Sequence, residues 1–279
     1  MNLKLPEGFD PEAVEFRSHP KAKACWNRAV TARSDDQTIT ILEEIGENWD
    51  GSGVTPNRIS AALAKIGDRP VTVVINSPGG DLFDGLAIFN LLKNHSQPIT
   101  VQIVGVAGSA ASIIAMAGDE VQIAKAGMLF IHNSQWVAIG DKKVMLQAHN
   151  DMAVFDEVIA VAYNDRTDLA LAEIHAMMDA ETFIKGEDAV EQGFCDRLLP
   201  ADEVTEAENL APKTAAFKID ELLAKGKSVP RAERRALIKE ITEGTPRATF
   251  GVTPRADETE LDGLAHLRAA AMKLSLNRA

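Results

Sequence analysis

Two patterns of a buried strand followed by a helix constrain the fold of this chain most strongly. Residues 71–75 form a short apolar run rich in β-branched side chains, and residues 99–106 form a second apolar run. Such runs are typical of strands that are buried on both faces of a sheet. Apolar residues recur at helical spacing over 82–92, and a segment rich in small residues covers 109–117. This order predicts βαβ units with parallel pairing and right-handed crossovers, and therefore an α/β fold.

Further segments extend the alternation on both sides. Thr55 and Pro56 form a helix start signal before an alanine-rich stretch at 58–66, and β-branched residues at 38–45 predict a strand before it. Residues 121–124 and 128–131 predict two short strands, and an apolar stripe predicts a long amphipathic helix from 142 to about 168. Helices are also predicted over 169–178 and 186–192, with Gly193 as a C-terminal cap.

The charge pattern predicts a boundary near Pro200. Residues 1–200 carry 16 basic and 28 acidic side chains, whereas residues 201–279 carry 13 of each. We expect an irregular N-terminal arm over 1–35, a main domain over 36–200, and a tail over 201–279. The tail has helical patterns at 217–224, 231–242 and 258–276, and it repeats Thr-Pro-Arg-Ala at 245–248 and 253–256. Because prolines interrupt helix and sheet, the repeats predict a flexible linker.

Composition excludes several classes of protein. The net charge of −12 argues against a nucleic-acid-binding protein, which needs clustered Lys and Arg. No apolar run approaches the roughly 20 residues of a membrane span, and residues 1–10 lack the basic-then-apolar order of a signal peptide. Cys25 and Cys195 stand far apart, outside any metal-ligand spacing, which disfavours a disulfide framework or a zinc site. We therefore expect a cytoplasmic protein.

A glycine-rich turn follows the first buried run at Pro78, Gly79 and Gly80. Two glycines let the backbone take conformations that a side chain forbids, so that amide N–H groups can point into a cleft. Preorganised amides of this kind stabilise an oxyanion in acyl transfer. Taken alone, however, the pattern fits a tight connection from strand to helix better.

Ser109 lies where the second buried run becomes a helix, with alanine and glycine on both sides. Small neighbours allow a substrate backbone to approach, and a helix N-terminus stabilises negative charge that develops nearby. Ser109 is therefore a candidate nucleophile, although serine is also a common N-cap at such a place. Ser112 is the competing nucleophile, but it lies one turn further in, where we expect its hydroxyl to bond back to a carbonyl.

His132 follows the apolar segment 128–131 and precedes a polar stretch. An imidazole at the end of a strand can reach a cleft and act as a general base, whereas a single histidine is more often structural. None of the other histidines has a comparable setting, because they lie in arms, in loops or on helix faces: His19, His95, His149, His175 and His266.

Four stretches in order resemble the ClpP peptidase family: residues 75–80, the segment around Ser109, residues 130–132, and residues 187–196. The similarity covers about residues 36–199. It extends to the phage and prophage branch, the head maturation or prohead proteases, in which Asn-Ser-Pro-Gly-Gly-Asp and Ser-Ala-Ala-Ser followed by Met-Ala-Gly are typical. The resemblance implies a ClpP/crotonase-like spiral of βαβ units, with a long handle helix after Lys142.

The resemblance also implies roles for residues. Ser109 aligns with the nucleophile of the family and His132 with its base. Gly80 stands 29 positions before Ser109 and aligns with the glycine that supplies one amide of the oxyanion hole, and Ala110 would supply the second.

The third member of the triad is less well defined. Glu181 aligns with it, although the larger enzymes of the family carry Asp there. A glutamate orients the imidazole in some hydrolases, so Glu181 suits the role. Asp179 is the fallback.

The implied activity is that of a serine endopeptidase that acts on protein substrates without a metal or an organic cofactor. The phage branch implies capsid, scaffold or portal proteins as substrates, in the host cytoplasm or inside the prohead. The family norm implies a homo-oligomeric ring, such as stacked heptamers, and docking of a Clp ATPase stays open.

Three alternatives remain: a general ClpP-type proteolytic subunit that degrades unfolded proteins with a Clp ATPase, a crotonase-type acyl-CoA enzyme, and a catalytically inactive capsid assembly protein. Ser109 and His132 argue against a crotonase, which usually relies on carboxylates.

Overall fold

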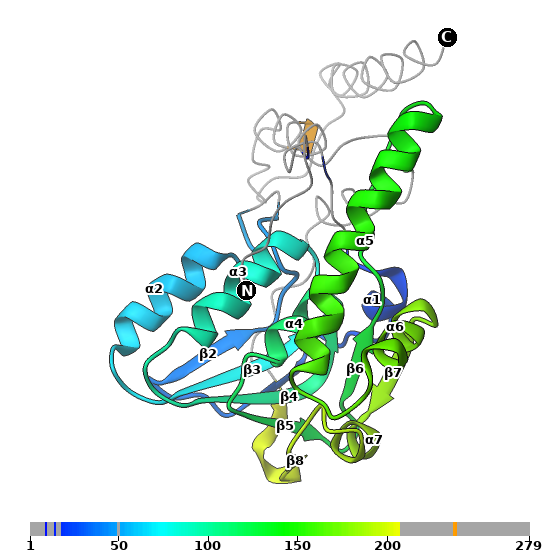
Figure 1. Cartoon of the computed structure of the whole chain (residues 1–279). Coiled ribbons are helices and arrows are strands. Elements are labelled where there is room, and N and C mark those ends of the chain that lie inside the picture. Colours follow the sequence, from blue (N-terminus) through cyan, green and yellow to red (C-terminus); the bar gives the residue numbers. More distant parts are fainter. Residues whose placement is uncertain (1–8, 10–13, 15–17, 49–50, 207–236, 239–279) are drawn as a thin grey trace, which may run out of the picture. The chain divides into compact units, whose positions relative to one another are not determined.

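Parallel strands organise the chain over the residues that the computed structural model describes, which are 9, 14, 18–48, 51–206 and 237–238 (Figure 1). Five strands pair in parallel and lie side by side in this order: β2 (Thr38–Ile41), β3 (Val71–Ser77), β4 (Ile99–Gly108), β5 (Glu120–Ala124) and β8 (Arg197–Leu199). The predicted α/β class and the βαβ order are therefore confirmed.

Strand β4 is long enough to pair with two strands on the same side. Its first half pairs with β5, and its last residues pair in parallel with β6 (Met128–Ile131). Strand β6 in turn pairs antiparallel with β7 (Thr182–Lys185). As a result, the carboxyl ends of β4 and β6 lie next to each other, and the chain leaves them at Ser109 and His132.

One face of the sheet is covered by α2 (Pro56–Ile66), α3 (Leu82–Lys93), α4 (Ala110–Ala115) and α5 (Lys142–Asn164) (Figure 1). The predicted helix start holds, because the Thr55 hydroxyl accepts the N–H of Arg58 at the beginning of α2. Asp81 caps α3 in the same way. Two shorter helices follow along the chain, α6 (Leu171–Asp179) and α7 (Gly186–Glu191). In the described part of the chain, no helix is long and apolar enough to cross a membrane.

The central strands are buried on both faces, as their apolar runs predict. Val73 and Ile75 of β3 have no exposed surface and face the main core beneath the helices. Val74 is equally buried but packs on the other face, in a smaller cluster with Val104 and Leu199. Full burial of such side chains stabilises the fold by about 1.5–3 kcal/mol each.

The N-terminal arm is more regular than we expected. It contains α1 (Pro20–Cys25) and β1 (Val30–Ala32), which pairs antiparallel with β9 (Val204–Glu206). The buried side chain of Asn76 holds the arm, because its Nδ2 donates to the carbonyl of Val30 at 2.9 Å. Trp26 donates its indole N–H to the Asn76 carbonyl at 2.8 Å. The arm is thereby tied to the carboxyl end of β3.

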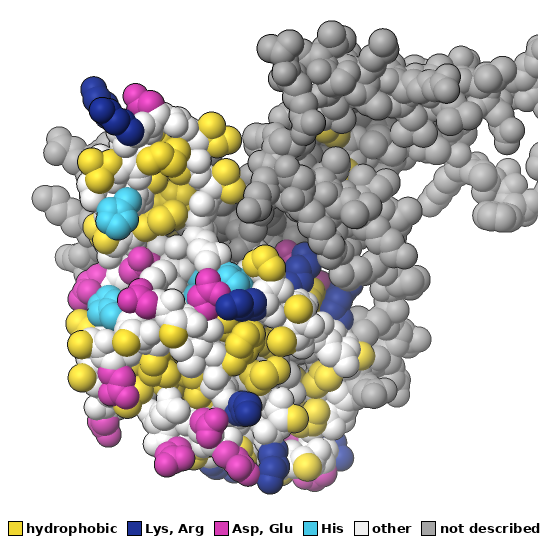
Figure 2. Space-filling model, turned by 90° about the vertical axis from the view of Figure 1, so that its right-hand side faces the viewer, with side chains coloured by type: hydrophobic (Ala, Val, Ile, Leu, Met, Phe, Trp, Pro, Cys, Tyr) yellow, Lys and Arg dark blue, Asp and Glu magenta, His cyan; other side chains and the backbone are white. Residues whose placement is uncertain are grey.

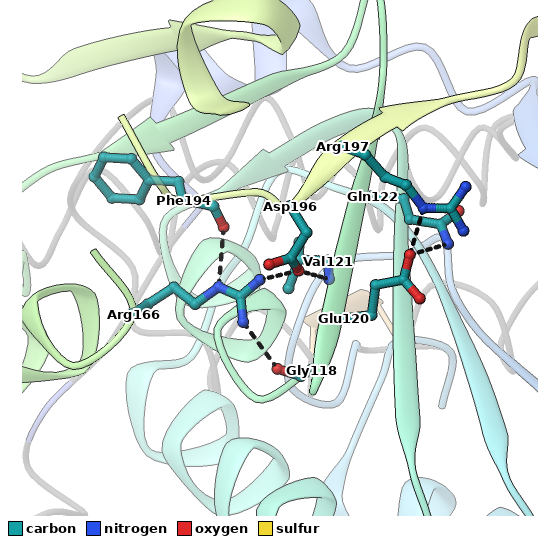
Figure 3. A network of polar contacts seen from close by, with 8 residues as sticks. All are labelled: Gly118, Glu120, Val121, Gln122, Arg166, Phe194, Asp196 and Arg197. Carbon is teal, nitrogen blue, oxygen red and sulfur yellow. Dashed lines mark hydrogen bonds and ion pairs between the residues drawn. The ribbon is translucent and has the colours of Figure 1, made fainter. Parts of the chain in front are cut away.

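A polar network fastens the end of α5 to the sheet (Figure 3). Arg166 donates to the carboxylate of Asp196 and to the carbonyls of Phe194 and Gly118. Asp196 also accepts the N–H of Val121 at 2.6 Å, at the start of β5. These contacts give Asp196, three residues after the predicted cap Gly193, a role in holding α5 against β5.

The first half of α5 projects from the body of the protein (Figure 1). Hydrophobic side chains gather on this projection (Figure 2). Leu146 is 61% exposed and Val144 is 45% exposed. The projection matches the position of the implied handle helix, which begins at Lys142 as predicted and ends at Asn164.

Most of the predicted tail lies outside the described residues. This applies to both Thr-Pro-Arg-Ala repeats and to the helical patterns at 217–224 and 258–276. Within the pattern at 231–242, the described residues Leu237 and Ile238 are helical, and Ile238 is buried.

Candidate active site

The turn between β3 and α3 requires glycine at two positions. Gly79 and Gly80 have φ values of 86° and 153°, which strain residues with a side chain. A Cβ on Gly79 would lie 2.7 Å from the Cβ of Ser109, and one on Gly80 would lie 2.2 Å from the carbonyl oxygen of Ile45. The turn therefore packs directly on Ser109. Among the described residues, the N–H of Gly80 has no hydrogen-bond acceptor.

Ser109 has a strained backbone at the junction of β4 and α4. Its φ is 53° and its ψ is −127°, and only Ser109 and Glu181 combine a side chain with a positive φ among the described residues. Such conformations cost about 1–3 kcal/mol and cluster at functional sites. Ser109 occupies the N-cap position of α4, but its hydroxyl makes no capping hydrogen bond. The N–H of Ala110 lies free beside it, again among the described residues.

The Ser112 hydroxyl bonds back to a carbonyl, as predicted. Its buried hydroxyl lies 2.6 Å from the Ser109 carbonyl and 2.7 Å from the Tyr163 hydroxyl. Both contacts occupy the Ser112 oxygen within the core. Burial also raises the pKa of Tyr163, so the phenol stays protonated.

His132 is held in the tautomer that a general base needs. Its Nδ1 lies 2.5 Å from the carbonyl oxygen of Asn133. Because a carbonyl only accepts, Nδ1 carries the proton and Nε2 presents a lone pair. That Nε2 is buried and has no hydrogen-bond partner. Burial lowers the pKa of His132 to about 4, so the imidazole is neutral at neutral pH.

One pocket brings three of the predicted residues together. Gly80, Ser109 and His132 line it, and Leu82 and Ile159 contribute apolar walls. The pocket therefore contains an unbonded hydroxyl, an imidazole lone pair and an N–H group at the end of a glycine turn. These groups suit a nucleophile, a base and an oxyanion donor.

Glu181 is turned away from His132 in this structure. Its Oε2 lies 2.6 Å from Nζ of Lys21, and its Oε1 lies 3.5 Å from Nε2 of His19. The hydrogen bond from Lys21 holds the pKa of Glu181 below its ordinary value, so the carboxylate is ionised. The expected pairing of Glu181 with His132 is thus absent here, because the ammonium of Lys21 attracts the carboxylate.

His19 is a residue that sequence reasoning missed. Its ring lies 4.7 Å from the His132 ring between centroids, and only 6% of its surface is exposed. His19 lies in the N-terminal arm, and the sequence pattern did not indicate that it packs against His132. The proline after His19, at the first position of α1, was the available signal for this helix.

Asp179 contacts the neighbour of His132. Its Oδ1 accepts the side-chain N–H of Asn133 at 2.7 Å. Asn133 is also the residue whose carbonyl binds Nδ1 of His132. Asp179 therefore acts on the base only through Asn133 in this structure.

The described residues contain no group of three or more His, Cys, Asp or Glu side chains placed to bind a metal ion.

Comparison with known proteins gives a consistent family. A family model described as Clp protease matches residues 22–202. The ATP-dependent Clp protease proteolytic subunit of Chlorella vulgaris is 27% identical over 191 residues, which cover 66% of this chain and 92% of that protein. Subunit 1 from Prochlorococcus marinus is 27% identical over 151 residues, covering 52% of this chain and 77% of its own length. The Deinococcus radiodurans subunit is 24% identical over 135 residues, covering 47% and 66%.

Proposed function

This chain belongs to the Clp protease family, and on that premise we propose that it is a serine endopeptidase with Ser109 as its nucleophile. One observation carries the proposal. Ser109 has a strained backbone and an unbonded hydroxyl, and it shares a pocket with the free Nε2 of His132. A serine without a catalytic role has no need of this conformation, because a strained backbone is costly.

The reaction follows from the groups in the pocket. His132 Nε2 takes the proton of the Ser109 hydroxyl, and the Ser109 oxygen attacks the carbonyl carbon of a peptide bond. The oxyanion accepts hydrogen bonds from the N–H groups of Gly80 and Ala110. The protonated imidazole then gives its proton to the leaving amine, and an acyl-enzyme forms. Water, deprotonated by His132, releases the acid product and restores Ser109.

We assign the third role to Glu181. For catalysis its carboxylate leaves Lys21 and accepts the Nδ1–H of His132 in place of the Asn133 carbonyl. The support is that Glu181 is ionised and near enough for its charge to favour protonation of His132. A carboxylate in this role stabilises the imidazolium that forms during attack.

The proposed substrates are proteins, and the finer proposal is maturation of phage heads by cleavage of capsid, scaffold or portal proteins. It rests on the motifs around Gly80 and Ser109 that resemble the phage branch. A general Clp-type subunit that works with an ATPase is the second candidate, favoured by the names of the relatives. We also propose a homo-oligomeric ring, because the exposed apolar side chains of α5 offer a surface for another copy.

Labelling with a fluorophosphonate tests the nucleophile. We expect one label on Ser109, lost in Ser109→Ala and kept in Ser112→Ala, with intact mass and peptide mapping as the readout. A label that persists in Ser109→Ala contradicts the assignment. Absence of any label in a folded wild-type protein favours the crotonase-type or inactive alternatives.

A second experiment separates the two candidate substrates. In the first arm, the purified protein is incubated with phage capsid and scaffold proteins. In the second arm, it is incubated with an unfolded protein, a Clp ATPase and ATP. Ser109→Ala is the control in both arms. New termini found by mass spectrometry in the first arm alone support head maturation. ATP-dependent cleavage in the second arm alone supports the general proteolytic subunit.

A further inference from the structure

A cluster of aromatic rings follows residues that line the candidate active site, and we call it the aromatic cleft because the ring of Phe9 packs among its members. Phe83 and Phe155 face each other edge to face with ring centroids 5.3 Å apart, and Trp136 lies 5.8 Å from Phe155. The three rings come from α3, from the segment after His132, and from α5. Aromatic rings that meet at such angles form a favourable site for a further ring.

Two of the three aromatic residues directly follow, in the chain, residues that line the catalytic pocket. Phe83 follows Leu82, which lines that pocket together with Gly80. Trp136 follows Gln135, which lines the same pocket together with His132. An extended peptide with its carbonyl carbon at Ser109 would leave the pocket between these two segments. Successive residues of an extended chain advance about 3.3 Å each, so a nearby side chain of the peptide would reach the rings.

The cleft already holds a side chain of this protein. The ring of Phe9 lies 5.3 Å from Phe155, 5.8 Å from Phe83 and 6.0 Å from Trp136 between centroids. The side chain of Val14 also packs against the main core. An aromatic ring therefore fits among these three rings.

Three more residues near the N-terminus, Ser18, His19 and Lys21, contact the catalytic groups or the turn beside them. The hydroxyl of Ser18 donates to the carbonyl of Gly79 at 3.3 Å. The ring of His19 lies against His132, and Lys21 pairs with Glu181. Contacts of this region thus extend from the aromatic cleft to the glycine turn, the base and the acid.

We propose that the cleft of Phe83, Trp136 and Phe155 is a specificity subsite for an aromatic side chain of the protein substrate, and that Phe9 occupies it as a competitor within the chain. The proposal rests on the proposed peptidase function. It predicts that substrates carry a large aromatic residue close to the cleaved bond, and that the N-terminal region lowers the affinity for them.

Binding to an inactive enzyme tests the subsite without requiring turnover. The full-length Ser109→Ala protein is titrated into labelled alanine-based peptides in which a single Phe is moved from position to position, and binding is followed by fluorescence anisotropy. We expect one Phe position to bind best. Adding Phe9→Ala should tighten binding of that peptide about tenfold and leave the all-alanine peptide unchanged, since one ring no longer competes with another.

Two further variants make the outcome specific. Val14→Ala removes an apolar side chain that packs against the main core but no aromatic ring, so it should leave the Phe preference and the affinity unchanged. Trp136→Ala should abolish the preference for Phe. Equal binding of all peptides, or no tightening in Phe9→Ala, would overturn the inference. Failure of Ser109 to react with a fluorophosphonate would overturn the peptidase function instead, so the two failures are distinguishable.

Discussion

Replacing Lys21 with methionine should accelerate the reaction of Ser109. Methionine keeps most of the apolar stem and suits a helix, but it removes the ammonium that lies 2.6 Å from Oε2 of Glu181. If Glu181 must leave this ion pair before it can orient His132, the pair holds the triad apart. Its removal therefore shifts the population towards the assembled site.

The exposure of the pair determines the size of the effect. The Lys21 side chain is 56% exposed and that of Glu181 is 33% exposed. Ion pairs with this degree of exposure contribute about 0.2–1 kcal/mol, which corresponds to a gain of about 1.4- to 5-fold in the assembled fraction. His19, 3.5 Å from the other oxygen of Glu181, remains in the variant and keeps the gain near the lower end.

The assay is the second-order rate constant of fluorophosphonate labelling at low ionic strength and pH 8. Added salt should raise the wild-type rate towards that of Lys21→Met, because screening weakens an exposed ion pair. Lys23→Met is the matched control, since Lys23 lies on the same helix and pairs with Glu44 at 2.8 Å. An unchanged or slower rate in folded Lys21→Met, with Lys23→Met at the wild-type rate, would refute the reasoning.

Three further predictions concern the base, the acid and the buried serine. Glu181→Gln should lower the labelling rate about 10²- to 10⁴-fold. Asp179→Asn should change the rate only a few-fold, because Asp179 contacts Asn133 and not His132. If Asp179→Asn has the larger effect, Asp179 is the acid of the triad. His132 has a pKa of about 4 in the folded protein and 6.5 ordinarily, so the unfolded chain binds the proton first and stability falls as pH drops from about 6.5 towards 4. Urea titrations measure how much unfolding free energy each protein loses between pH 7 and pH 4.5. This loss should be roughly 2 kcal/mol smaller in His132→Gln than in the wild type, and equal losses would contradict the burial argument. Ser112→Ala should cost about 1–3 kcal/mol of unfolding free energy, because the Tyr163 hydroxyl loses its partner, while Ser109 still labels; a neutral substitution in the same titration would count against the buried contact.

Local patterns were sufficient for most of the helices and the central strands. The run at 71–75 becomes β3, and its valines and isoleucine are buried because both faces of the strand are covered. Helix α2 begins at Thr55 and Pro56 as predicted. The Thr55 hydroxyl accepts a backbone N–H and the ring of Pro56 fixes φ, and both effects act only on the adjacent turn. Interactions of this kind are decided within a few residues, so they can be read along the chain.

Elements that depend on distant partners were missed. Strand β7 has four residues and no strong alternation, and it exists because β6 offers an edge for antiparallel pairing. Helix α1 has six residues, too few for a periodic pattern, and the side chain of Asn76 holds the following segment in place. Short elements gain most of their stability from tertiary contacts rather than from propensity.

Local sequence patterns are enough to locate the reactive groups along the chain. Gly80, Ser109 and His132 each follow an apolar strand, and the carboxyl ends of neighbouring parallel strands meet at one edge of a sheet, so the pocket they share was foreseeable. The partner of Glu181, in contrast, follows from the three-dimensional arrangement of the chain. That choice depends on the distance and exposure of Lys21 and His19, which lie far away in sequence, and Coulomb energy is set by separation in space.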